Sequence, residues 1–570
     1  LVKRLRLRYY DRNLKQLRST DARKWWSSIK RFVGSGTSSK NQLSSLVSNL
    51  YDGDYEHFIN DVNNSFAHVS SDLAPLNDTF MTQLQDDYCS DYIIEPWEIE
   101  LKLSEICVNK SPGPDCIPNW FLREMAPFVA EPLCAIFNLS VKQGSVPAYW
   151  KHANVVPVPK TQPPKNIYFD LRPISLTSTL VKVFESFIGN WILDKINNKL
   201  DKDQYGAVKG RSTVHALVSI LHQWSCALDR GESVRALFVD YTKAFDHIDH
   251  TILLNKLMTL GVPHFLVKWM FSFLSQRKQR VKVNGALSEW ITLTGAMPQG
   301  TWLGPLMFIS FIHDLMPSCP VHKFIDDVTL TELLKRNDSC SIMDDIVEEL
   351  IKWSVANKMI ISCNKTKEMI LGGIRNNPPQ ELTVNENQIE RVSVFKLLGV
   401  YVSDDLLWDQ NIEKICNKVS TKLYFLKLLK RAGLSLDDLR YFYIAVVRPV
   451  LEYACVVWNH NLTKSQSDRL ESLQKRALRI IYGDLATGNP YLTVLSLVKL
   501  ESLQERRHKL SKFFFDKICQ EDNCLHDLLP PERDPTLLTK LRHPNRFPLP
   551  VCRTKRYQSF INYGLHKYQD

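Results

Sequence analysis

The sequence contains no closely paired cysteines, although it has thirteen of them in 570 residues. They are scattered singly, without a Cys-x-x-Cys pair, which excludes a regular disulfide framework and indicates free thiols in a reducing compartment. Cys519, Cys524 and His526 are the nearest approach to a zinc cluster. No fourth ligand lies near them in the sequence, so we do not expect a zinc site.

Long apolar runs and a secretory signal are also missing. The longest apolar stretch, residues 444–458, is interrupted by Arg448, Pro449 and Glu452, so the sequence predicts no transmembrane helix and no membrane partner. The sequence starts at Leu1 rather than at Met, so we expect a fragment or a truncated reading frame. With 44% hydrophobic residues the chain has enough core material for two to four folded domains.

Positive charge is concentrated at the start of the chain. The formal net charge is +11, and residues 1–31 contain eleven Lys and Arg against two Asp, with two Tyr and two Trp interleaved. Such a segment suits phosphates and stacked bases, but it also suits a solvated amphipathic helix. Composition leaves both interpretations open.

Hydrophobic periodicity and turn residues predict a mixture of helices and strands. Helices are expected over residues 1–33, 95–108, about 116–142, 172–198, 246–258, 303–315, 342–357, 411–431, 436–458, 463–482 and 500–520. Strands are expected over residues 155–160, 234–240, 279–283, 290–294, 323–330, 359–362, 367–371 and 395–402, with the acids of 323–330 at a hairpin turn. Residues 34–46 are rich in Gly and Ser and predict a flexible linker.

Three carboxylates stand in strand-like, apolar surroundings. Asp240 ends the run Leu237–Val239, and Asp326 and Asp327 follow Phe324-Ile325. Acids at the ends of buried strands are costly unless a cation neutralises them, and a pair of Mg²⁺ ions held by such acids is typical of nucleotidyl transfer. The usual alternative for an Asp-Asp pair is a surface turn, which we expect for 344–345, 404–405 and 437–438.

Several motifs resemble, in order along the chain, those of reverse transcriptases of LINE-type (non-LTR), jockey-like retrotransposons. They are Arg172-Pro-Ile-Ser-Leu176, Gln204-Tyr-Gly206, Gly210-Arg-Ser-Thr213, Val239-Asp-Tyr-Thr-Lys-Ala-Phe-Asp246, Ala296-Met-Pro-Gln-Gly-Thr-Trp-Leu-Gly-Pro305, Phe324-Ile-Asp-Asp327, Trp353 with Asn357 and Lys365-Thr-Lys367, Phe395-Lys-Leu-Leu-Gly-Val400, Arg448-Pro-Val-Leu-Glu-Tyr453 and Gln474-Lys-Arg-Ala477. The resemblance covers roughly residues 95–485.

The resemblance implies an α+β right-hand polymerase with fingers, a palm built on a small antiparallel sheet, and a helical thumb. The expected divisions of the chain are a basic arm and linker (1–46), an N-terminal extension and the start of the fingers (47–139), fingers and palm (140–402), a helical thumb (403–485) and a basic C-terminal region (486–570).

The resemblance also implies a role for individual residues. Asp240, Asp326 and Asp327 would be catalytic and hold two Mg²⁺ ions, with Mn²⁺ as an alternative, and Lys365 would protonate the pyrophosphate, with Lys367 as a rival. Expected nucleotide-binding residues are Lys160, Arg172, Tyr241, Phe245 as a gate against a ribose 2′-hydroxyl, Gln299 and Gly300. Expected template or primer contacts are Arg211, Leu398 and Gly399. Solvated charge or core packing is the bland alternative for Lys160, Arg211 and Phe245.

The sequence departs from the family pattern at three places. Ile325 stands where Ala is common, Ser362 stands where Asn is expected, and Thr301-Trp302 is bulkier than usual. None of these changes removes a predicted metal ligand.

The implied function is RNA-directed DNA polymerisation with target-primed reverse transcription. The implied partners are an RNA template, a DNA primer or target, dNTP, and an endonuclease located upstream or acting in trans, and the implied location is a ribonucleoprotein in cytoplasm and nucleus. Two alternatives remain: a catalytically decayed nucleic-acid binder, and a relative of intron maturases.

Overall fold

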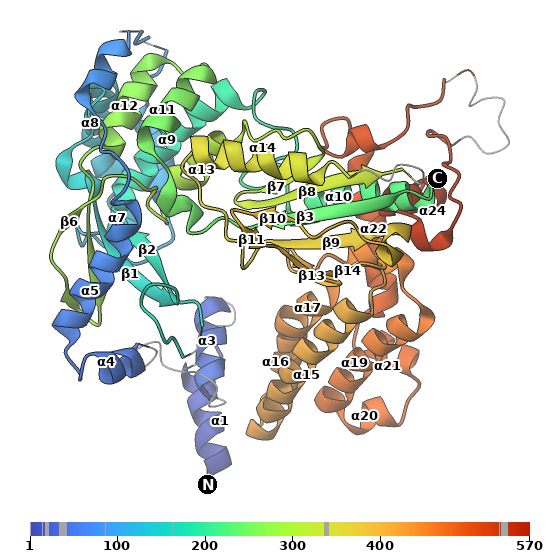
Figure 1. Cartoon of the computed structure of the whole chain (residues 1–570). Helices are drawn as coiled ribbons and strands as arrows, with labels where there is room; N and C mark the ends of the chain where they lie inside the picture. The colour runs from blue at the N-terminus through green and yellow to red at the C-terminus, as the bar shows by residue number, and fades with distance from the viewer. Residues whose placement is uncertain are drawn as a thin grey trace.

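In the part of the chain that the structure describes, two five-stranded sheets, two two-stranded sheets and a large set of helices form the fold, which confirms the predicted α+β class. The computed structural model describes all residues except 1, 14, 17–21, 33–42, 86, 90, 162, 336–340, 535, 537–544 and 570. Figure 1 shows the longer sheet at the centre, a lobe formed by the first half of the chain on the left, and the orange helices of residues 409–518 at the lower right. We keep the names palm, fingers and thumb for these three parts.

The palm sheet has the strand order β12-β9-β3-β8-β7. Its central strand, β3 (Ser233–Val239), pairs antiparallel with β8 (Asp327–Leu334) and with β9 (Lys367–Leu371), while β7 (Val321–Phe324) and β12 (Glu390–Arg391) lie at the edges. The register places Val239 opposite Val328. The strand after which Asp240 comes therefore lies directly beside the hairpin that contains Asp326 and Asp327.

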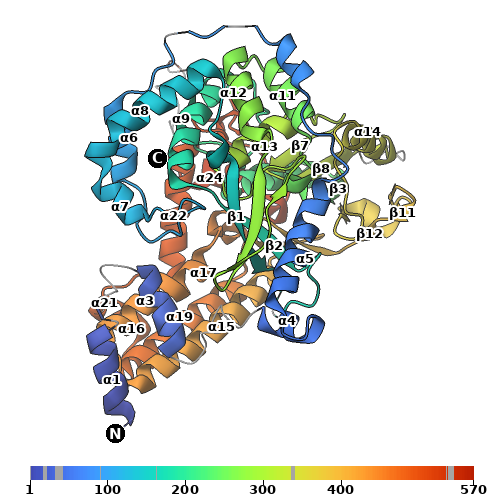
Figure 2. The same cartoon turned by 90° about the vertical axis from the view of Figure 1, so that its left-hand side faces the viewer.

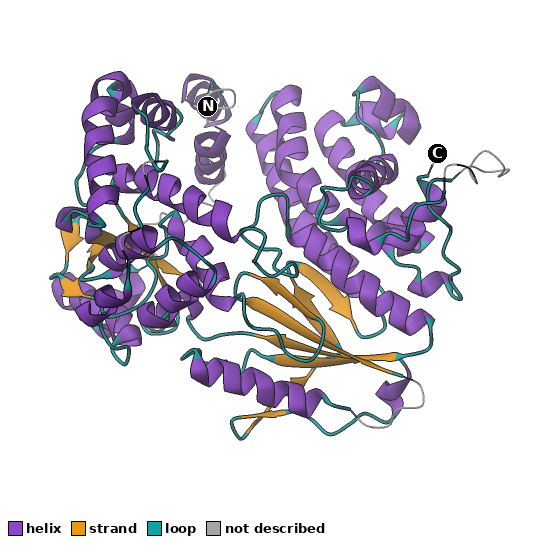
Figure 3. Cartoon of the chain, turned by 90° about the horizontal axis from the view of Figure 1, so that it is seen from above, coloured by secondary structure: helices purple, strands orange, loops and turns teal. Residues whose placement is uncertain are grey.

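Both faces of β3 are buried, which explains why its sequence is apolar without alternation. Leu237 and Val239 belong to the same core as the fingers helices. Ala236 and Phe238 point to the other core, which includes helix α10 (Thr213–Asp229) and the thumb. Figure 3 shows the sheet, in orange, between these helical layers.

The β7–β8 hairpin, with Ile325 and Asp326 in its turn, confirms the prediction for residues 323–330. Two other strand predictions are corrected. Residues 359–362 form only one isolated bridge, from Ile361 to Tyr241. Residues 395–402 are two strands, β13 (Val394–Leu397) and β14 (Val400–Ser403), because Leu398 and Gly399 have positive φ and turn the chain back on itself.

The fingers contain the second sheet, which includes β1 (His152–Pro159), β2 (Leu171–Leu176) and β4 (Lys278–Val283). Residues 172–176 were predicted to open a helix, but they form strand β2, and helix α9 (Thr179–Ile196) begins after them. Pro173 explains the difference, because the residue before a proline is pushed to the extended region. The predicted hairpin after β4 is confirmed: β5 (Ala286–Leu287) and β6 (Ile291–Thr292) both pair with it.

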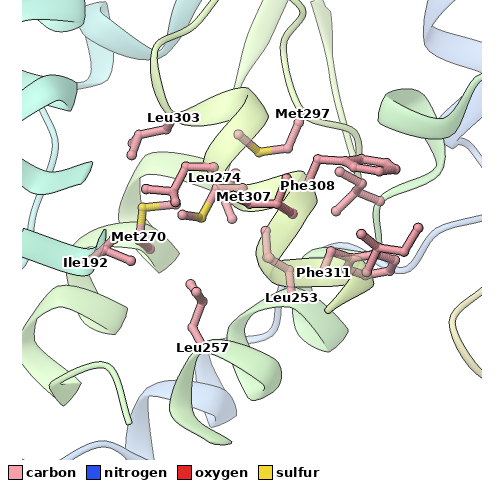
Figure 4. Close-up of a cluster of buried hydrophobic side chains, with 14 of the residues drawn as sticks. Ile192, Leu253, Leu257, Met270, Leu274, Met297, Leu303, Met307, Phe308 and Phe311 are labelled. Carbon is pink, nitrogen blue, oxygen red and sulfur yellow. The ribbon is translucent and has the colours of Figure 1, made fainter. Parts of the chain in front are cut away.

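A large apolar core joins the fingers to the palm. Helices α9, α11 (His250–Thr259), α12 (His264–Leu274) and α13 (Leu303–Ile312) supply most of it, together with α6 (Pro96–Ser104), α7 (Asn119–Glu124), α8 (Ala126–Gln143) and α14 (Met343–Ala356). Figure 4 shows Met297, Met307 and Phe308 of this core beside Leu253 and Leu274. Met297 is two residues before Gln299, so the loop that presents Gln299 is anchored in the core.

The thumb consists of α15 (Asp409–Ala432), α16 (Leu436–Phe442), α17 (Arg448–Glu452), α18 (Cys455–Trp458), α19 (Lys464–Tyr482) and α22 (Leu503–Ile518), with the short α20 (Asp484–Thr487) and α21 (Tyr491–Leu497). The predicted continuous helix 436–458 is wrong, because a π-helix (Tyr443–Val447) interrupts it and Ala454 has a φ of +50°. Within the described residues no single helix is long and apolar enough to cross a membrane; the bent pair Leu436–Glu452 and Cys455–Asn461 passes by length and composition.

The basic N-terminal segment is two helices, α1 (Val2–Asn13) and α3 (Ala22–Phe32), rather than one. Figures 1 and 2 show both helices beside the thumb. Trp25 is buried and meets the ring of Tyr441 edge-on, and the ring of Trp26 lies 5.3 Å from that of Phe442. These tryptophans therefore pack on the thumb and are not free platforms for bases.

Part of the predicted linker, residues 34–42, lies outside the described residues. Helix α4 (Ser44–Leu50) begins within its remainder, because Leu46 and Val47 are apolar and join a small core with α5 (Tyr55–Ala67) and the fingers sheet. At the other end of the chain, α24 (Phe560–Lys567) packs on α10, where His222 and Ser559 form a side-chain hydrogen bond of 2.8 Å. The C-terminal region thus lies against the palm.

Candidate active site

The three predicted carboxylates meet at one end of the palm sheet. Asp240 directly follows β3, Asp326 is in the β7–β8 turn, and Asp327 begins β8. Burial and the neighbouring Asp240 raise the pKa of Asp326, and burial with both other acids raises the pKa of Asp327 to about 6. The pairing of β3 with β8 and of β7 with β8 therefore brings the three carboxylates to the same end of the palm sheet.

Lys365 contributes a cation to this group. Its Nζ lies 3.1 Å from Asp240 Oδ2, while Lys367, the rival in the sequence, pairs with Glu390 at 2.8 Å. Within the part of the chain that the structure describes, no three Asp, Glu, His or Cys side chains are arranged to hold a metal ion. The assignment of metal ligands therefore stays a prediction, whereas the choice of Lys365 over Lys367 is favoured by position.

The turn that contains Asp326 is held in an unusual conformation. Ile325 has a φ of +59°, which a β-branched residue rarely adopts and which costs about 1–2 kcal/mol. Gln204 Oε1 accepts hydrogen bonds from the amides of Ile325 and Gly206, both at 2.9 Å. A Cβ at Gly206 would lie 2.6 Å from the Ile325 nitrogen. The Gln-Tyr-Gly motif thus supports the turn that carries the carboxylates.

Four basic side chains lie near one another at this site: Lys160 and Arg172 come from the fingers, and Lys243 and Lys365 come from the palm. Lys160 follows β1 and donates to the Phe169 carbonyl at 2.9 Å. Burial and the nearby charges of Lys365, Lys243 and Arg172 lower the pKa of Lys160. Lys243 was not among the predicted site residues, although it lies in the motif that contains Asp240. A cluster of like charges on the fingers and palm suits a polyanionic ligand.

Gln299 and Gly300 approach this cluster from the loop before α13. The Gln299 carbonyl accepts the Ser175 amide at 2.8 Å. Gly300 has a φ of +126°, and a Cβ there would lie 2.6 Å from the Ser175 carbonyl oxygen. Glycine is therefore required for packing against β2, whether or not a nucleotide also approaches its backbone.

Two predicted nucleotide contacts are placed differently from one another. Phe245 is partly buried, and its ring stacks on Phe308 with centroids 4.7 Å apart. Tyr241 is only 3% exposed, and its hydroxyl lies 3.4 Å from Ser354 Oγ inside the core. The Tyr241–Ile361 bridge accompanies this buried side chain, and the contact of Tyr241 with nucleotide stays a prediction.

Comparison with known proteins identifies this arrangement. Residues 158–402, which contain every acid and base described above, match the family model for reverse transcriptase (RNA-dependent DNA polymerase). Residues 158–402 are a reverse transcriptase domain, and the chain is similar to polymerases of mobile elements. The right-hand polymerase fold expected for such a domain is the one described here.

Relatives of the reverse transcriptase come from mobile elements. The chain is 26% identical over 461 residues to the probable RNA-directed DNA polymerase from transposon X-element of Drosophila melanogaster, which covers 78% of this chain and 50% of the relative. It is 25% identical over 422 residues to the RNA-directed DNA polymerase from mobile element jockey of the same species, with coverages of 69% and 46%. The chain thus spans about half the length of these curated relatives.

A solved structure of telomerase from Candida albicans, in complex with a fragment of telomeric RNA, aligns with 68% of this chain and 69% of its own, at 12% identity and a TM-score of 0.34.

The bulky pair Thr301-Trp302, which departs from the family pattern after Pro-Gln-Gly, is accommodated by two residues of α9. The Trp302 ring occupies the space above Gly189, where a Cβ would lie 1.9 Å from the ring. Glu185 Oε2 accepts the amides of Trp302 at 2.7 Å and Leu303 at 3.1 Å, and so caps α13. Burial raises the pKa of Glu185. Sequence reasoning missed Glu185, because an acid inside an apolar helix gives no signal of its partner.

The predicted primer and template contacts of the reverse transcriptase domain are held by internal hydrogen bonds. Leu398 and Gly399 form the β13–β14 turn, and the Tyr453 hydroxyl donates to the Leu398 carbonyl at 2.8 Å. Arg211 donates to the carbonyls of Lys202 at 2.5 Å and Gln204 at 2.8 Å. The Arg211 guanidinium thus stabilises the loop before α10, and its contact with template stays a prediction.

Replacing Gln204 by Ala should weaken the turn of the reverse transcriptase that carries Asp326. The substitution leaves two amides, of Gly206 and Ile325, without their acceptor, at a cost of about 1–3 kcal/mol. Thermal unfolding should report the loss, and primer extension should fall with it. The exposed Gln143→Ala serves as the control. An unchanged melting temperature in Gln204→Ala would contradict the supporting role.

Proposed function

We propose that the chain is an RNA-directed DNA polymerase that extends a DNA primer on an RNA template, as the names of its relatives state for them. The observation that supports this proposal most is the group of Asp240, Asp326 and Asp327 beside four basic side chains. Acids and bases brought together from two sheets suit a reaction in which cations and a polyphosphate meet. A pure binder of nucleic acid has no need of the acids.

Divalent cations would suit the oxygen atoms of these three carboxylates, whose side chains would have to shift to hold one. Their burial and mutual repulsion raise the pKa values of Asp326 and Asp327, and oxygen ligands of this kind are those that Mg²⁺ prefers. Asp240 and Asp326 would hold the ions, with Asp327 adjacent. Two bound Mg²⁺ ions would lower the pKa of the primer 3′-hydroxyl and neutralise the triphosphate.

The basic side chains would bind the phosphates of the incoming nucleotide. Lys160 and Arg172 would hold the triphosphate, since they lie on the fingers strands that face the palm. Lys365, which pairs with Asp240, would give a proton from its ammonium group to the pyrophosphate. Phe245, backed by Phe308, would exclude a ribose 2′-hydroxyl.

The cellular process is a further part of the proposal. We infer target-primed reverse transcription at a nicked genomic site, in a ribonucleoprotein that is present in cytoplasm and nucleus, because the relatives belong to non-LTR elements. The nick requires an endonuclease, located upstream or acting in trans.

Primer extension tests the proposal directly. With poly(rA)/oligo(dT), dTTP and Mg²⁺ the chain should lengthen the primer, and EDTA should stop it, because chelation removes the ions that the carboxylates would hold. A poly(dA) template with the same primer measures the preference for RNA. No extension, with RNA binding retained in a gel-shift assay, would contradict the polymerase and favour a catalytically decayed binder.

A further inference from the structure

Asp246 is a carboxylate of the site to which no role has been given. It lies in the short 3₁₀-helix Ala244–His247, and its Oδ1 accepts a hydrogen bond from Gln299 Nε2 at 3.1 Å. Both side chains line one small cavity between fingers and palm, together with Ser175 and Arg277. Gln299 thus contacts an acid in the 3₁₀-helix that follows Asp240 in the chain.

An ionised carboxylate imposes one orientation on an amide. It can only accept hydrogen bonds, whereas an amide donates from nitrogen and accepts at oxygen. The contact with Asp246 therefore requires that the Gln299 nitrogen faces Asp246 and that Oε1 faces away from it. A neutral partner such as asparagine would allow either orientation.

The charges around Asp246 favour its ionised form against burial. Burial raises the pKa of Asp246 to about 6, while the hydrogen bond from Gln299 and the ammonium groups of Lys243 and Lys160 act in the opposite direction. At neutral pH the carboxylate is therefore mostly ionised. Lys243 and Lys160 belong to the basic cluster described above, so the acid and the cluster support one another.

The backbone of Gln299 is fixed independently. Its carbonyl accepts the Ser175 amide at 2.8 Å, and Gly300 packs against the same strand. Met297, two residues earlier, is fully buried in the core. The main chain is fixed by β2 and the amide nitrogen by Asp246, whereas no hydrogen bond among the described residues occupies Oε1 of Gln299.

We propose that Asp246 is a positioning residue, which orients the Gln299 amide so that its oxygen is presented to the incoming deoxynucleoside triphosphate. This inference rests on the proposed function, because it takes the ligand to be a dNTP. Asp246 acts through Gln299 and does not itself touch the nucleotide.

A double-mutant cycle in nucleotide affinity tests the inference. The Kd of dTTP is measured on poly(rA) with a dideoxy-terminated oligo(dT) primer and Mg²⁺, for the parent, Asp246→Asn, Gln299→Ala and the double variant. Each single substitution should weaken dTTP binding about fivefold to tenfold, as expected for one oriented hydrogen bond. The double variant should bind no more weakly than Gln299→Ala, because Asp246 acts only through Gln299.

Controls separate positioning from structure. Asp345→Asn, at an exposed position of α14, should leave the Kd unchanged. Asp246→Asn should not lower the melting temperature, because a neutral amide replaces a carboxylate that burial disfavours. Equal losses in both backgrounds, or no loss in Asp246→Asn, would overturn the inference.

The terminated primer also separates this inference from the proposed function. Affinity is measured without turnover, so dTTP binding that follows the predicted cycle supports the role of Asp246 even when a 3′-hydroxyl primer is not extended. In that case only the polymerase proposal fails. A parent chain that binds no dTTP would overturn both.

Discussion

Asp326→Asn should abolish primer extension, with a fall of at least about 1000-fold, since losing one charged ligand to a reacting metal removes several kcal/mol of transition-state stabilisation. Asparagine keeps the shape of the side chain and can still accept the hydrogen bonds of the turn. It removes one of three converging negative charges, so the fold should be unchanged or slightly more stable. Steady-state extension on poly(rA)/oligo(dT) and thermal unfolding measure the two effects.

The exposed Asp345→Asn is the matched control, because it removes the same charge from an Asp-Asp pair on helix α14. It should keep the parent rate within about twofold, as surface substitutions usually have little effect. Gel-shift affinity for RNA should be equal in both variants. Extension by Asp326→Asn at a rate near that of the parent would exclude Asp326 from catalysis.

Glu368→Ala should give the largest loss of stability of any single change proposed here, about 3–5 kcal/mol. Glu368 is fully buried in β9 and pairs with Arg235 Nε at 2.5 Å and Arg391 Nε at 2.7 Å. Arg235, also fully buried, further donates to Ser341 Oγ and the Gln380 carbonyl at 2.7 Å. Without Glu368 the charge of Arg235 stays in the interior with its main partner removed.

Glu390→Gln provides the comparison on the neighbouring strand β12. Glu390 is two-thirds exposed and pairs with Lys367 at 2.8 Å, so its loss should cost at most about 1 kcal/mol. Urea and thermal unfolding of both variants, read by circular dichroism, give the difference. Similar midpoints for Glu368→Ala and Glu390→Gln would show that the ion pairs of Glu368 with Arg235 and Arg391 contribute little to stability.

Much of the palm could be predicted from sequence because its signals are local. The apolar run before Asp240, the acids between two short apolar segments, and the amphipathic pattern of residues 342–357 each indicate one element, and the structure confirms all three. The order of the motifs then predicted which strand ends meet. The convergence of Asp240 with Asp326 needed only the antiparallel pairing of β3 and β8.

What the sequence did not predict depends on partners far away along the chain. Gln204 supports the turn at Ile325 across 121 residues, and Glu185 caps α13 across 117 residues. Neither side chain signals its partner by spacing. The prediction of a helix at 172–176 was wrong for a related reason. Pairing with β1 and the restriction before Pro173 outweigh the helical pattern that follows. The N-terminal aromatics were open to two interpretations until the thumb surface that buries Trp25 was known.

The contact of Tyr453 with the β13–β14 turn has a mechanical consequence. Its hydroxyl reaches both the Leu398 carbonyl and Thr213 Oγ1, so one side chain ties the end of α17 to the hairpin and to the first turn of α10. A rotation of the thumb must therefore either carry the hairpin with it or break this link. Because Thr213 begins α10 beneath the palm sheet, the same rotation must also stretch or break the contact between thumb and palm.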